Sequence, residues 1–427
     1  MRTSTRFAAA VATAALLIPL AGCSGTSGAA GGDDVVEIDF FHRWPNEPKN
    51  TYFNTLVDEF EAENPDIRVN VESVLNDAYK DKVKVVAGSD SAPDVMFSWS
   101  GSFVEELVDG GNAMNLDEWL GDNPDIKDRY YESQLEAFSV DGAQYGLPIG
   151  MHAKLFFYNK DAFDELGLDV PTTWDEFLDV LDTIQDSGAV PIEMGAQEQW
   201  PIAHYVGTLN QRMLAADVFE GDQSAADGEF TDPGYVEALE RLNELAEYMN
   251  PDLTAVGHEV ARNAWIAGEA PIMYLQGSEV NYFEGIGFDY GTFNFPAVDG
   301  GEGDPLQLTG APEGFVVAAN TEHPEESLRF LEFMLNKENG IAYTEDTGEL
   351  SAVVDAVAES GAPDILKDIA TQIVDATEMT PWLDNAYDPQ IVQTYLAEAQ
   401  LMLGGQQTPE GVMKAVQEAA ERVRSES

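Results

Sequence analysis

The sequence has little of two residue types that strongly shape a protein's chemistry, cysteine and the basic side chains. It contains one cysteine in 427 residues, so no disulfide can form within the chain, and Cys23 is either a free or a modified thiol. Lysine and arginine together number 21, against 78 aspartates and glutamates, for a formal net charge of -57. Polyanions repel such a chain, which excludes nucleic acids and anionic lipid surfaces as its main partners.

Long hydrophobic runs are also missing, apart from one near the amino terminus. Residues 7–20 are mostly apolar and follow Arg2 and Arg6, but the run is shorter than the ~20 residues that a membrane span needs. This pattern is typical of a secretory signal. We therefore expect residues 1–22 to be a signal peptide and the mature protein to lie outside the membrane.

The residues around the cysteine indicate how it is modified. Leu20-Ala21-Gly22-Cys23 resembles the lipobox of bacterial lipoproteins. The resemblance implies that Cys23 is lipidated and holds the protein on the outer face of the cell membrane, with no other membrane attachment. Residues 23–33 are rich in Ser, Gly and Ala and are expected to form a flexible tether. The alternative is a secreted protein with an incidental cysteine.

Motifs for metals and nucleotides are absent from the sequence. The five histidines show no His-x-x-x-His spacing and no cysteine cluster accompanies them, which argues against a zinc site. No Gly-x-x-x-x-Gly-Lys-Ser/Thr loop is present, so an ATPase would have to be another subunit. We expect no cofactor and no metal. With 78 acids, accidental carboxylate pairs are inevitable and carry almost no information.

What the sequence does contain is an alternation of strand and helix patterns. Val36, Ile38 and Phe40 alternate with polar residues, residues 52–60 carry apolar side chains at helical spacing, and residues 67–71 alternate again. This order predicts an α/β fold with largely parallel sheets, whose ligand sites lie at the carboxyl ends of the strands.

Helix boundaries are legible in places, and helices dominate the last quarter of the chain. Thr173-Trp174-Asp175-Glu176 predicts a capping box at the start of a helix. Helical spacing dominates after residue 320, over 323–335, 391–403 and 408–423.

A series of short motifs then resembles the solute-binding proteins of sugar ABC importers, the maltose-binding-like family. The resemblance extends over nearly the whole mature chain. The motifs, in order, are Phe60 to Ile67 (FEAENPDI), Ala92 to Val95 (APDV), Tyr145 to Pro148 (YGLP), Phe157 to Lys160 (FYNK), Pro171 to Phe177 (PTTWDEF), Trp265 to Met273 (WIAGEAPIM) and Gly314 to Val317 (GFVV).

This resemblance implies a two-lobed periplasmic-binding-protein fold of the class II type. Each lobe would hold a mainly parallel sheet with flanking helices, and the ligand would lie in the cleft between them. Lobe 1 is expected to comprise residues 34–148 and 300–346, and lobe 2 residues 149–299 and 347–427. The chain departs from the family at the third crossing, where residues 347–351 read Thr-Gly-Glu-Leu-Ser and lack the usual proline.

Seven tryptophans are candidates for the flat surfaces on which sugar rings stack. Three have core-like settings, because Trp119 has helical spacing, Trp174 lies in the capping box and Trp265 lies on a helix. The other four occupy loop-like settings beside polar residues, and we expect them to contact ligand. These are Trp44, Trp99, Trp200 and Trp382.

Polar side chains near these tryptophans are expected to bind the ligand's hydroxyl groups. For His152, just past the first crossing, a hydrogen-bonded hinge role is the alternative. The predicted polar ligand contacts are Asn46, Glu47, His152, Gln276, Ser278, Glu313 and Asp384.

The function implied is that of a non-catalytic, monomeric receptor that binds a sugar or oligosaccharide and delivers it to the permease subunits of an ABC transporter. Two alternatives stay open: a membrane-tethered glycoside hydrolase, and a binding protein for a peptide, polyamine or metal. From sequence alone, replacing Trp200 or Trp382 by alanine is expected to weaken ligand binding and leave thermal stability nearly intact.

Overall fold

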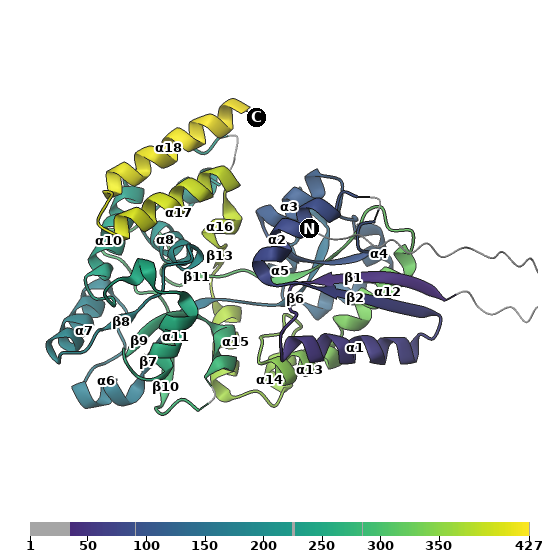
Figure 1. Ribbon diagram of the computed structural model, residues 1–427, viewed down its shortest axis with the longest axis horizontal. Coiled ribbons are helices and arrows are strands. Elements are labelled where there is room, and N and C mark those ends of the chain that lie inside the picture. The colour runs from purple at the N-terminus through teal and green to yellow at the C-terminus, as the bar shows by residue number, and fades with distance from the viewer. Residues whose placement is uncertain (1–34, 90, 224–226, 284, 427) are drawn as a thin grey trace, which may run out of the picture. The chain divides into compact units, whose positions relative to one another are not determined.

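The computed structural model describes residues 35–426 except 90, 224–226 and 284. Cys23, the signal segment and the whole of the predicted tether lie outside the described residues. The chain forms two lobes, each built on its own sheet (Figure 1). The predicted alternation is confirmed at the start of the chain, which runs β1 (Val36–His42), α1 (Lys49–Glu63), β2 (Ile67–Ser73), α2 (Asn76–Val86) and β3 (Val95–Trp99).

The first sheet has the strand order β2-β1-β3-β12-β6, with β6 spanning Gly146–Gly150 and β12 spanning Glu313–Val317. β1 pairs in parallel with β2 and β3, whereas β12 runs antiparallel to β3 and β6. One core cluster packs this sheet against its helices, and includes Phe40, Phe53 and Phe330. The helices around it are α1, α2, α3 (Ser102–Asp109), α4 (Asp117–Asp122), α5 (Glu132–Glu136), α12 (Pro324–Met334) and α13 (Lys337–Thr347).

The second sheet has the order β10-β7-β9-β8, from β10 (Tyr290–Phe293), β7 (Lys154–Asn159), β9 (Ile272–Gln276) and β8 (Ile192–Glu193). Because successive side chains of a strand point to opposite faces of the sheet, the two faces of this sheet contribute to two separate hydrophobic cores. Phe156 and Tyr274 belong to one cluster, and Leu155, Phe157 and Leu275 belong to the other. The sheet is therefore buried on both faces.

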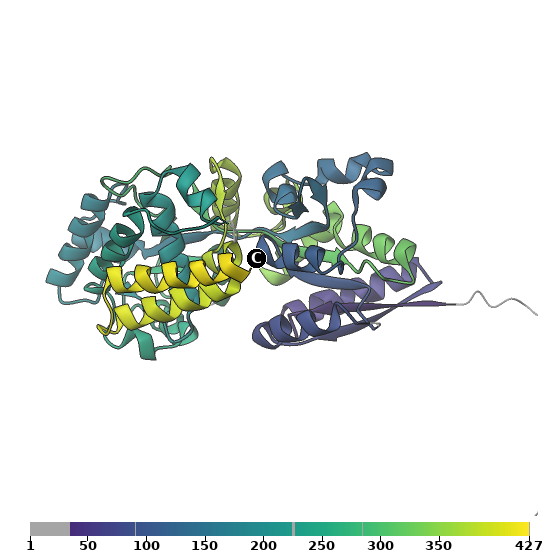
Figure 2. The same ribbon diagram turned by 90° about the horizontal axis from the view of Figure 1, so that it is seen from above.

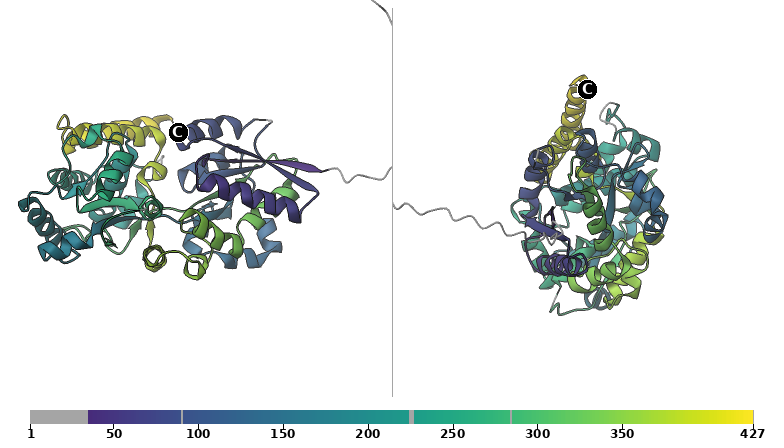
Figure 3. Two further views of the ribbon diagram at one scale, coloured as in Figure 1. Left: turned by 60° about the horizontal axis from the view of Figure 1, so that its bottom comes forward. Right: turned by 90° about the vertical axis from the view of Figure 1, so that its right-hand side faces the viewer.

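Helices cover both faces of the second sheet. The predicted capping box is confirmed at α7 (Trp174–Asp186), where Thr173 and Glu176 cap each other's backbone amides. α17 (Pro389–Leu403) and α18 (Pro409–Glu426) lie side by side, as Figures 2 and 3 show. The others include α6 (Lys160–Leu166), α8 (Trp200–Met213), α9 (Ala216–Gly221), α10 (Gly234–Ala246), α11 (His258–Ile266), α15 (Asp364–Asp375) and α16 (Leu383–Ala386). α14 (Ala356–Glu359) packs against α13 and α15 instead.

Each sheet contains one strand that runs against its neighbours, and both of these strands begin where the chain passes between the sheets. β7 follows β6 of the first sheet after three residues, and β12 follows β11 (Leu308–Thr309), which pairs with β13 (Met379–Thr380). Each of these two strands begins at the edge of the sheet where its antiparallel neighbours end, and runs in the opposite direction to them. As a result, the first residues of β7 and β12 lie beside the last residues of β9 and β3.

Three backbone segments meet at this edge. The amide of Met151, after β6, donates to the carbonyl of Leu350, after α13, at 2.9 Å. Gly310 passes so close to His152 that a Cβ there would lie 2.0 Å from the His152 carbonyl oxygen. Glycine is therefore required at 310, and the three segments form a compact junction beside the pocket described next.

Candidate ligand-binding site

A polar cavity of about 310 Å³ lies between the two sheets at the strand edge where the crossing segments meet. Its walls come from both lobes, with Trp99 at the end of β3 on one side and Gln276 at the end of β9 on the other. Eight of the eleven ligand contacts predicted from sequence line it: Trp99, His152, Trp200, Gln276, Ser278, Glu313, Trp382 and Asp384.

The other three predicted contacts, Trp44, Asn46 and Glu47, do not line this cavity. Trp44 is only 7% exposed and stacks on Phe53 of α1, with ring centroids 5.1 Å apart. Asn46 and Glu47 are exposed where the chain turns into α1, and the Glu47 carboxylate accepts the Thr51 amide at 3.1 Å. The loop after β1 thus folds its tryptophan into the core, and a ligand contact by these three residues stays a prediction.

The wall from the second lobe carries a row of four aromatic rings. Trp200, the first residue of α8, lies 4.3 Å from His258 and 5.2 Å from His204, and His204 lies 4.3 Å from Trp382, all between ring centroids. Burial, reinforced by Lys154, holds the pKa of His204 well below its ordinary value. This imidazole is therefore neutral, and the row presents flat, largely apolar surfaces.

The opposite wall, from the first lobe, carries Trp99. The Lys80 ammonium lies 5.1 Å from the centroid of a Trp99 ring, and 3.8 Å from the Asp384 carboxylate on the other lobe. Burial raises the pKa of Asp384. A ligand in the cavity would thus have an aromatic surface from each lobe, with one lysine–aspartate contact spanning the two lobes.

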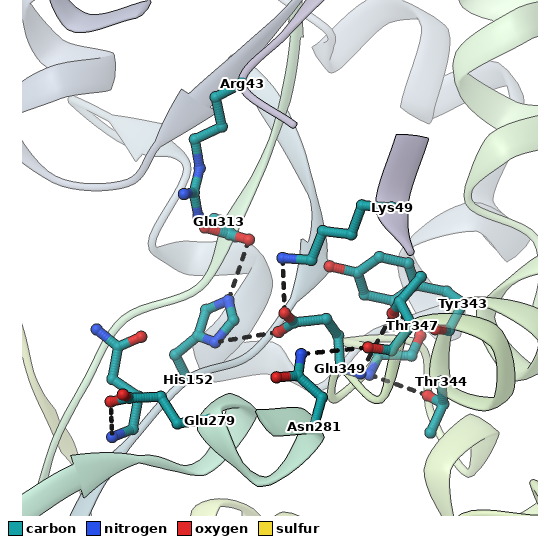
Figure 4. Close-up of polar contacts among 12 residues, drawn as sticks. Arg43, Lys49, His152, Glu279, Asn281, Glu313, Tyr343, Thr344, Thr347 and Glu349 are labelled. Carbon is teal, nitrogen blue, oxygen red and sulfur yellow. Dashed lines mark hydrogen bonds and ion pairs between the residues drawn. The ribbon is translucent and has the colours of Figure 1, made fainter. Parts of the chain in front are cut away.

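The floor of the cavity is a cluster of charged side chains at the junction of the three crossing segments (Figure 4). Arg43 pairs with Glu313, and the Lys49 ammonium lies 2.6 Å from a Glu349 oxygen. His152 lies between the two glutamates. Burial alone would raise the pKa of Glu313, but Arg43, His152 and Lys49 together lower it well below its ordinary value, so Glu313 is a carboxylate.

A second charged cluster surrounds Glu279 in the wall of the second lobe. Its carboxylate lies 2.7 Å from His258 Nε2, 3.3 Å from Arg262 and 3.8 Å from Lys154. Burial opposes ionisation, yet His258 and Lys154 lower the pKa of Glu279 far below its ordinary value. Lys154 is itself buried, which lowers its pKa to about 8.

The charged cluster around Glu279 also supports the aromatic row through Lys154. The Lys154 ammonium donates to the Tyr274 carbonyl at 3.1 Å and lies 5.2 Å from the centroid of Trp200. A cation at this distance attracts the electron-rich ring face. The interaction therefore helps to hold Trp200 in place.

Charges in the cavity balance, in contrast to the rest of the chain. Four acids line it (Glu279, Glu313, Glu349 and Asp384) together with four Lys or Arg residues (Arg43, Lys49, Lys80 and Arg262), whereas the whole chain has 78 acids and 21 bases. Each of these acids lies within ion-pair distance of at least one of these bases. Such a site offers many donors and acceptors with little net charge, which suits a neutral polar ligand.

Sequence reasoning missed most of these charged residues. Arg43, Lys49, Lys80, Arg262, Glu279 and Glu349 were not predicted, nor were His204 and His258. One available signal was the scarcity of bases, because basic residues that follow strands of so acidic a chain are candidates for a dedicated role.

A second, larger hollow of about 1120 Å³ adjoins the cavity and shares Lys80, Asp384 and Asn385 with it. It lies between α3 and the segment from Pro381 to Leu396. The two hollows therefore share a wall, and the larger one also has walls from both lobes.

Within the described ranges, no cluster of three or more His, Cys, Asp or Glu side chains could hold a metal ion. Over the same residues, no helix combines the length and the apolar character that crossing a membrane requires.

Comparison with known proteins gives the family. A profile described as bacterial extracellular solute-binding protein matches residues 44–341, well over half of the chain. The chain belongs to this family. Its members are binding proteins, and the two-lobed fold with a polar cavity between the sheets agrees with that description.

Individual relatives of this solute-binding protein are distant in sequence but cover most of its length. An ABC transporter extracellular-binding protein of Pyrococcus horikoshii is 25% identical over 93% of this chain and 90% of its own. The multiple sugar-binding protein of Streptococcus mutans is 25% identical over 81% of both chains.

Solved structures share the fold. A protein from work on xylan utilization by Caldanaerobius polysaccharolyticus superimposes with a TM-score of 0.81 at 23% identity, covering 90% of this chain and 99% of its own. A chitin oligosaccharide binding protein has a TM-score of 0.81 at 22% identity, covering 92% of this chain and 100% of its own. The two-lobed α/β fold predicted from the sequence is confirmed.

Proposed function

We propose that this protein captures a neutral sugar or oligosaccharide outside the membrane and delivers it to the permease of an ABC transporter, without catalysing a reaction. The observation that carries the proposal is the cavity itself, in which the Trp200–Trp382 row faces Trp99 around charge-balanced polar groups. A sugar has apolar C–H faces that stack on aromatic rings and hydroxyl groups that bind carboxylates, amides and cations.

The names of similar proteins support this ligand class. They include the multiple sugar-binding protein of Streptococcus mutans, a chitin oligosaccharide binding protein and a binding protein in complex with raffinose. These ligands are carbohydrates of different lengths, so the shared chemistry is the class and not one particular sugar.

We further propose that binding closes the two lobes about three crossing segments. Residues 34–148 and 300–346 were expected to form lobe 1, and 149–299 with 347–427 lobe 2. We infer that the second crossing lies at 310–312; the support is that Gln307 hydrogen-bonds to Arg212 and Thr380 of the second lobe. A ligand that touches both lobes favours the closed form by its differential affinity, and closure is the state that a permease would recognise.

The place of action in this proposal is the outer face of the cell membrane. Cys23 would carry the lipid and residues 23–33 the tether, with the folded part acting as a monomer. The family is extracellular. Mass spectrometry of the membrane-extracted protein tests the anchor: an amino-terminal peptide that begins at an acylated Cys23 supports it, and an unmodified Cys23 contradicts it.

A glycoside hydrolase is the rival, and the carboxylates of the cavity argue against it. A hydrolase needs one protonated carboxylic acid and one free carboxylate on either side of the bond it cleaves. Glu279 and Glu313 are ionised and held by cations, Glu349 is paired with Lys49, and Asp384 alone has a raised pKa. No second acid of the cavity is free to complete the pair.

Binding and turnover can be separated in one experiment. The purified protein is incubated with neutral mono-, di- and oligosaccharides and, in parallel, with peptides and polyamines, and each solute is then analysed by mass spectrometry. The proposal expects a thermal shift with at least one sugar and recovery of that sugar intact. Shortened sugar products would establish the hydrolase, and a shift confined to peptides or polyamines would establish a different solute.

A further inference from the structure

His152 occupies the one place in the described chain where all three crossing segments converge. Its own segment joins β6 to β7, its carbonyl lies against Gly310 of the second segment, and its neighbour Met151 donates to Leu350 of the third. The imidazole is 6% exposed and lies on the floor of the ligand cavity. Its ring can therefore interact with side chains from the other two segments and with a ligand.

The two ring nitrogens face two carboxylates. Nε2 lies 3.2 Å from Oε1 of Glu313, at the start of β12, and Nδ1 lies 3.9 Å from Oε2 of Glu349, after α13. The second oxygen of each carboxylate is held by a cation of the first lobe, Arg43 for Glu313 and Lys49 for Glu349. Figure 4 shows the resulting row, in which a base alternates with an acid from Arg43 to Lys49.

Five buried atoms in this row have no hydrogen-bond partner. They are Nε of Arg43, both ring nitrogens of His152, Oε1 of Glu313 and Oε2 of Glu349. Buried polar atoms normally have a partner, because leaving one unpaired costs about 1–3 kcal/mol. The imidazole nitrogens lie at ion-pair distances from the two carboxylates. A small movement of the ring or of the carboxylates, or a ligand hydroxyl placed between them, would form the missing hydrogen bonds of the imidazole and the carboxylates.

The protonation state of His152 decides whether both bonds can form. Only the imidazolium carries N–H on both nitrogens, whereas the neutral ring turns a lone pair toward one of the carboxylates. Two tyrosines also lie near this place: Tyr282 lines the cavity, and the Tyr343 hydroxyl lies on the same side of Gly150 as the imidazole. Burial and the two glutamates hold the pKa of Tyr343 well above its ordinary value, so it stays neutral.

We propose that His152 is a positioning residue: its imidazolium ties Glu313 of the second crossing to Glu349 of the third and orients both carboxylates toward the ligand. The tie joins the hinge to the binding site, so ligand affinity depends on the charge of one side chain. The effect on affinity rests on the proposed sugar-binding function, whereas the tie itself is a property of the protein without ligand.

The tie is tested first without ligand, by melting the parent, His152→Gln and a matched control, His323→Gln, at about pH 5 and pH 8, which bracket histidine titration. His323 precedes α12, outside the cavity lining. Glutamine cannot carry the charge, so the melting temperature of His152→Gln should fall further below that of the parent at pH 5 than at pH 8. The control should show no such difference. Equal deficits at the two pH values overturn the proposal.

The second test measures affinity by calorimetry with the neutral sugar that gives the largest thermal shift. The affinity of the parent should fall about tenfold from pH 5 to pH 8, equivalent to about 1.4 kcal/mol, and that of His152→Gln should stay flat. Glu349→Gln, which keeps the ring but removes one carboxylate, should also flatten the profile and serves if His152→Gln does not fold. Parallel pH profiles in parent and variants overturn the positioning role. A parent that binds no sugar contradicts the proposed function instead, and the melting test still decides the tie.

Discussion

Replacing Trp200 by alanine tests the aromatic row directly. Trp200 is half-buried between His258 and His204, with Lys154 beside its ring, and it lies outside the three hydrophobic cores. If a sugar ring stacks there, the variant loses the burial of a large side chain against the ligand. That burial is typically worth about 1.5–3 kcal/mol, which corresponds to an affinity about ten to more than a hundred times weaker.

Isothermal titration calorimetry with the best sugar of the panel measures this loss, and a thermal melt checks that the variant is folded. Trp119→Ala is the matched control, because Trp119 packs against the core of the first lobe, outside the cavity lining. The control should bind like the parent. Affinity of Trp200→Ala within about twofold of the parent would refute the stacking role, since a difference that small is only about 0.4 kcal/mol.

Three further predictions concern stability and its dependence on pH. Trp382 is only 6% exposed, so Trp382→Ala should lower the free energy of unfolding by about 3–5 kcal/mol as well as weaken binding; unchanged stability would contradict this packing role. Arg212 is buried and donates to three backbone carbonyls of residues 295–307, so Arg212→Met should cost about 3 kcal/mol in urea denaturation, and a cost below about 1 kcal/mol would show that this network contributes little. Burial, with Glu269 nearby, raises the pKa of Glu193 from 4.5 to about 7, so the folded state holds this proton more tightly than the unfolded state, and stability falls as pH rises through that window. At pH 8 the free energy of unfolding of Glu193→Gln should therefore exceed that of the parent by about 1–2 kcal/mol after solvent screening, and near pH 4 the two should be equal. A gain in free energy that is equal at both pH values would refute the assignment.

The parts of this protein that could be predicted from sequence are those fixed by neighbours along the chain. The alternation of β1, α1 and β2 follows from periodicity, and the Thr173–Glu176 capping box follows from four adjacent residues. Trp174 and Trp265 are buried as expected, and Trp119 packs against the first core. Gln276 and Glu313, two of the predicted polar residues that line the cavity, are the last residue of β9 and the first residue of β12.

The remaining features depend on residues that are far apart in sequence. Arg43 meets Glu313 only after the second crossing has brought β12 beside β3, and Lys49 meets Glu349 only after the third crossing, so no local pattern marks these partners. Trp44 shows a related limit. Its position after a strand predicts a ligand contact, which stays a prediction, and its ring packs on Phe53 of the next helix, outside the lining of the cavity. The burial of Trp382 also argues against the expectation that Trp382→Ala leaves stability nearly intact. Its sequence context is that of a loop, but the folded protein packs the side chain away from solvent.

The proposal that two lobes close on a sugar is tested most directly by small-angle X-ray scattering of the protein with and without the neutral sugar that it binds. Recognition by two lobes predicts that saturating sugar lowers the radius of gyration of the parent, and that Trp200→Ala needs a correspondingly higher sugar concentration for the same change. A radius of gyration that stays constant while calorimetry reports full binding would contradict capture by lobe closure.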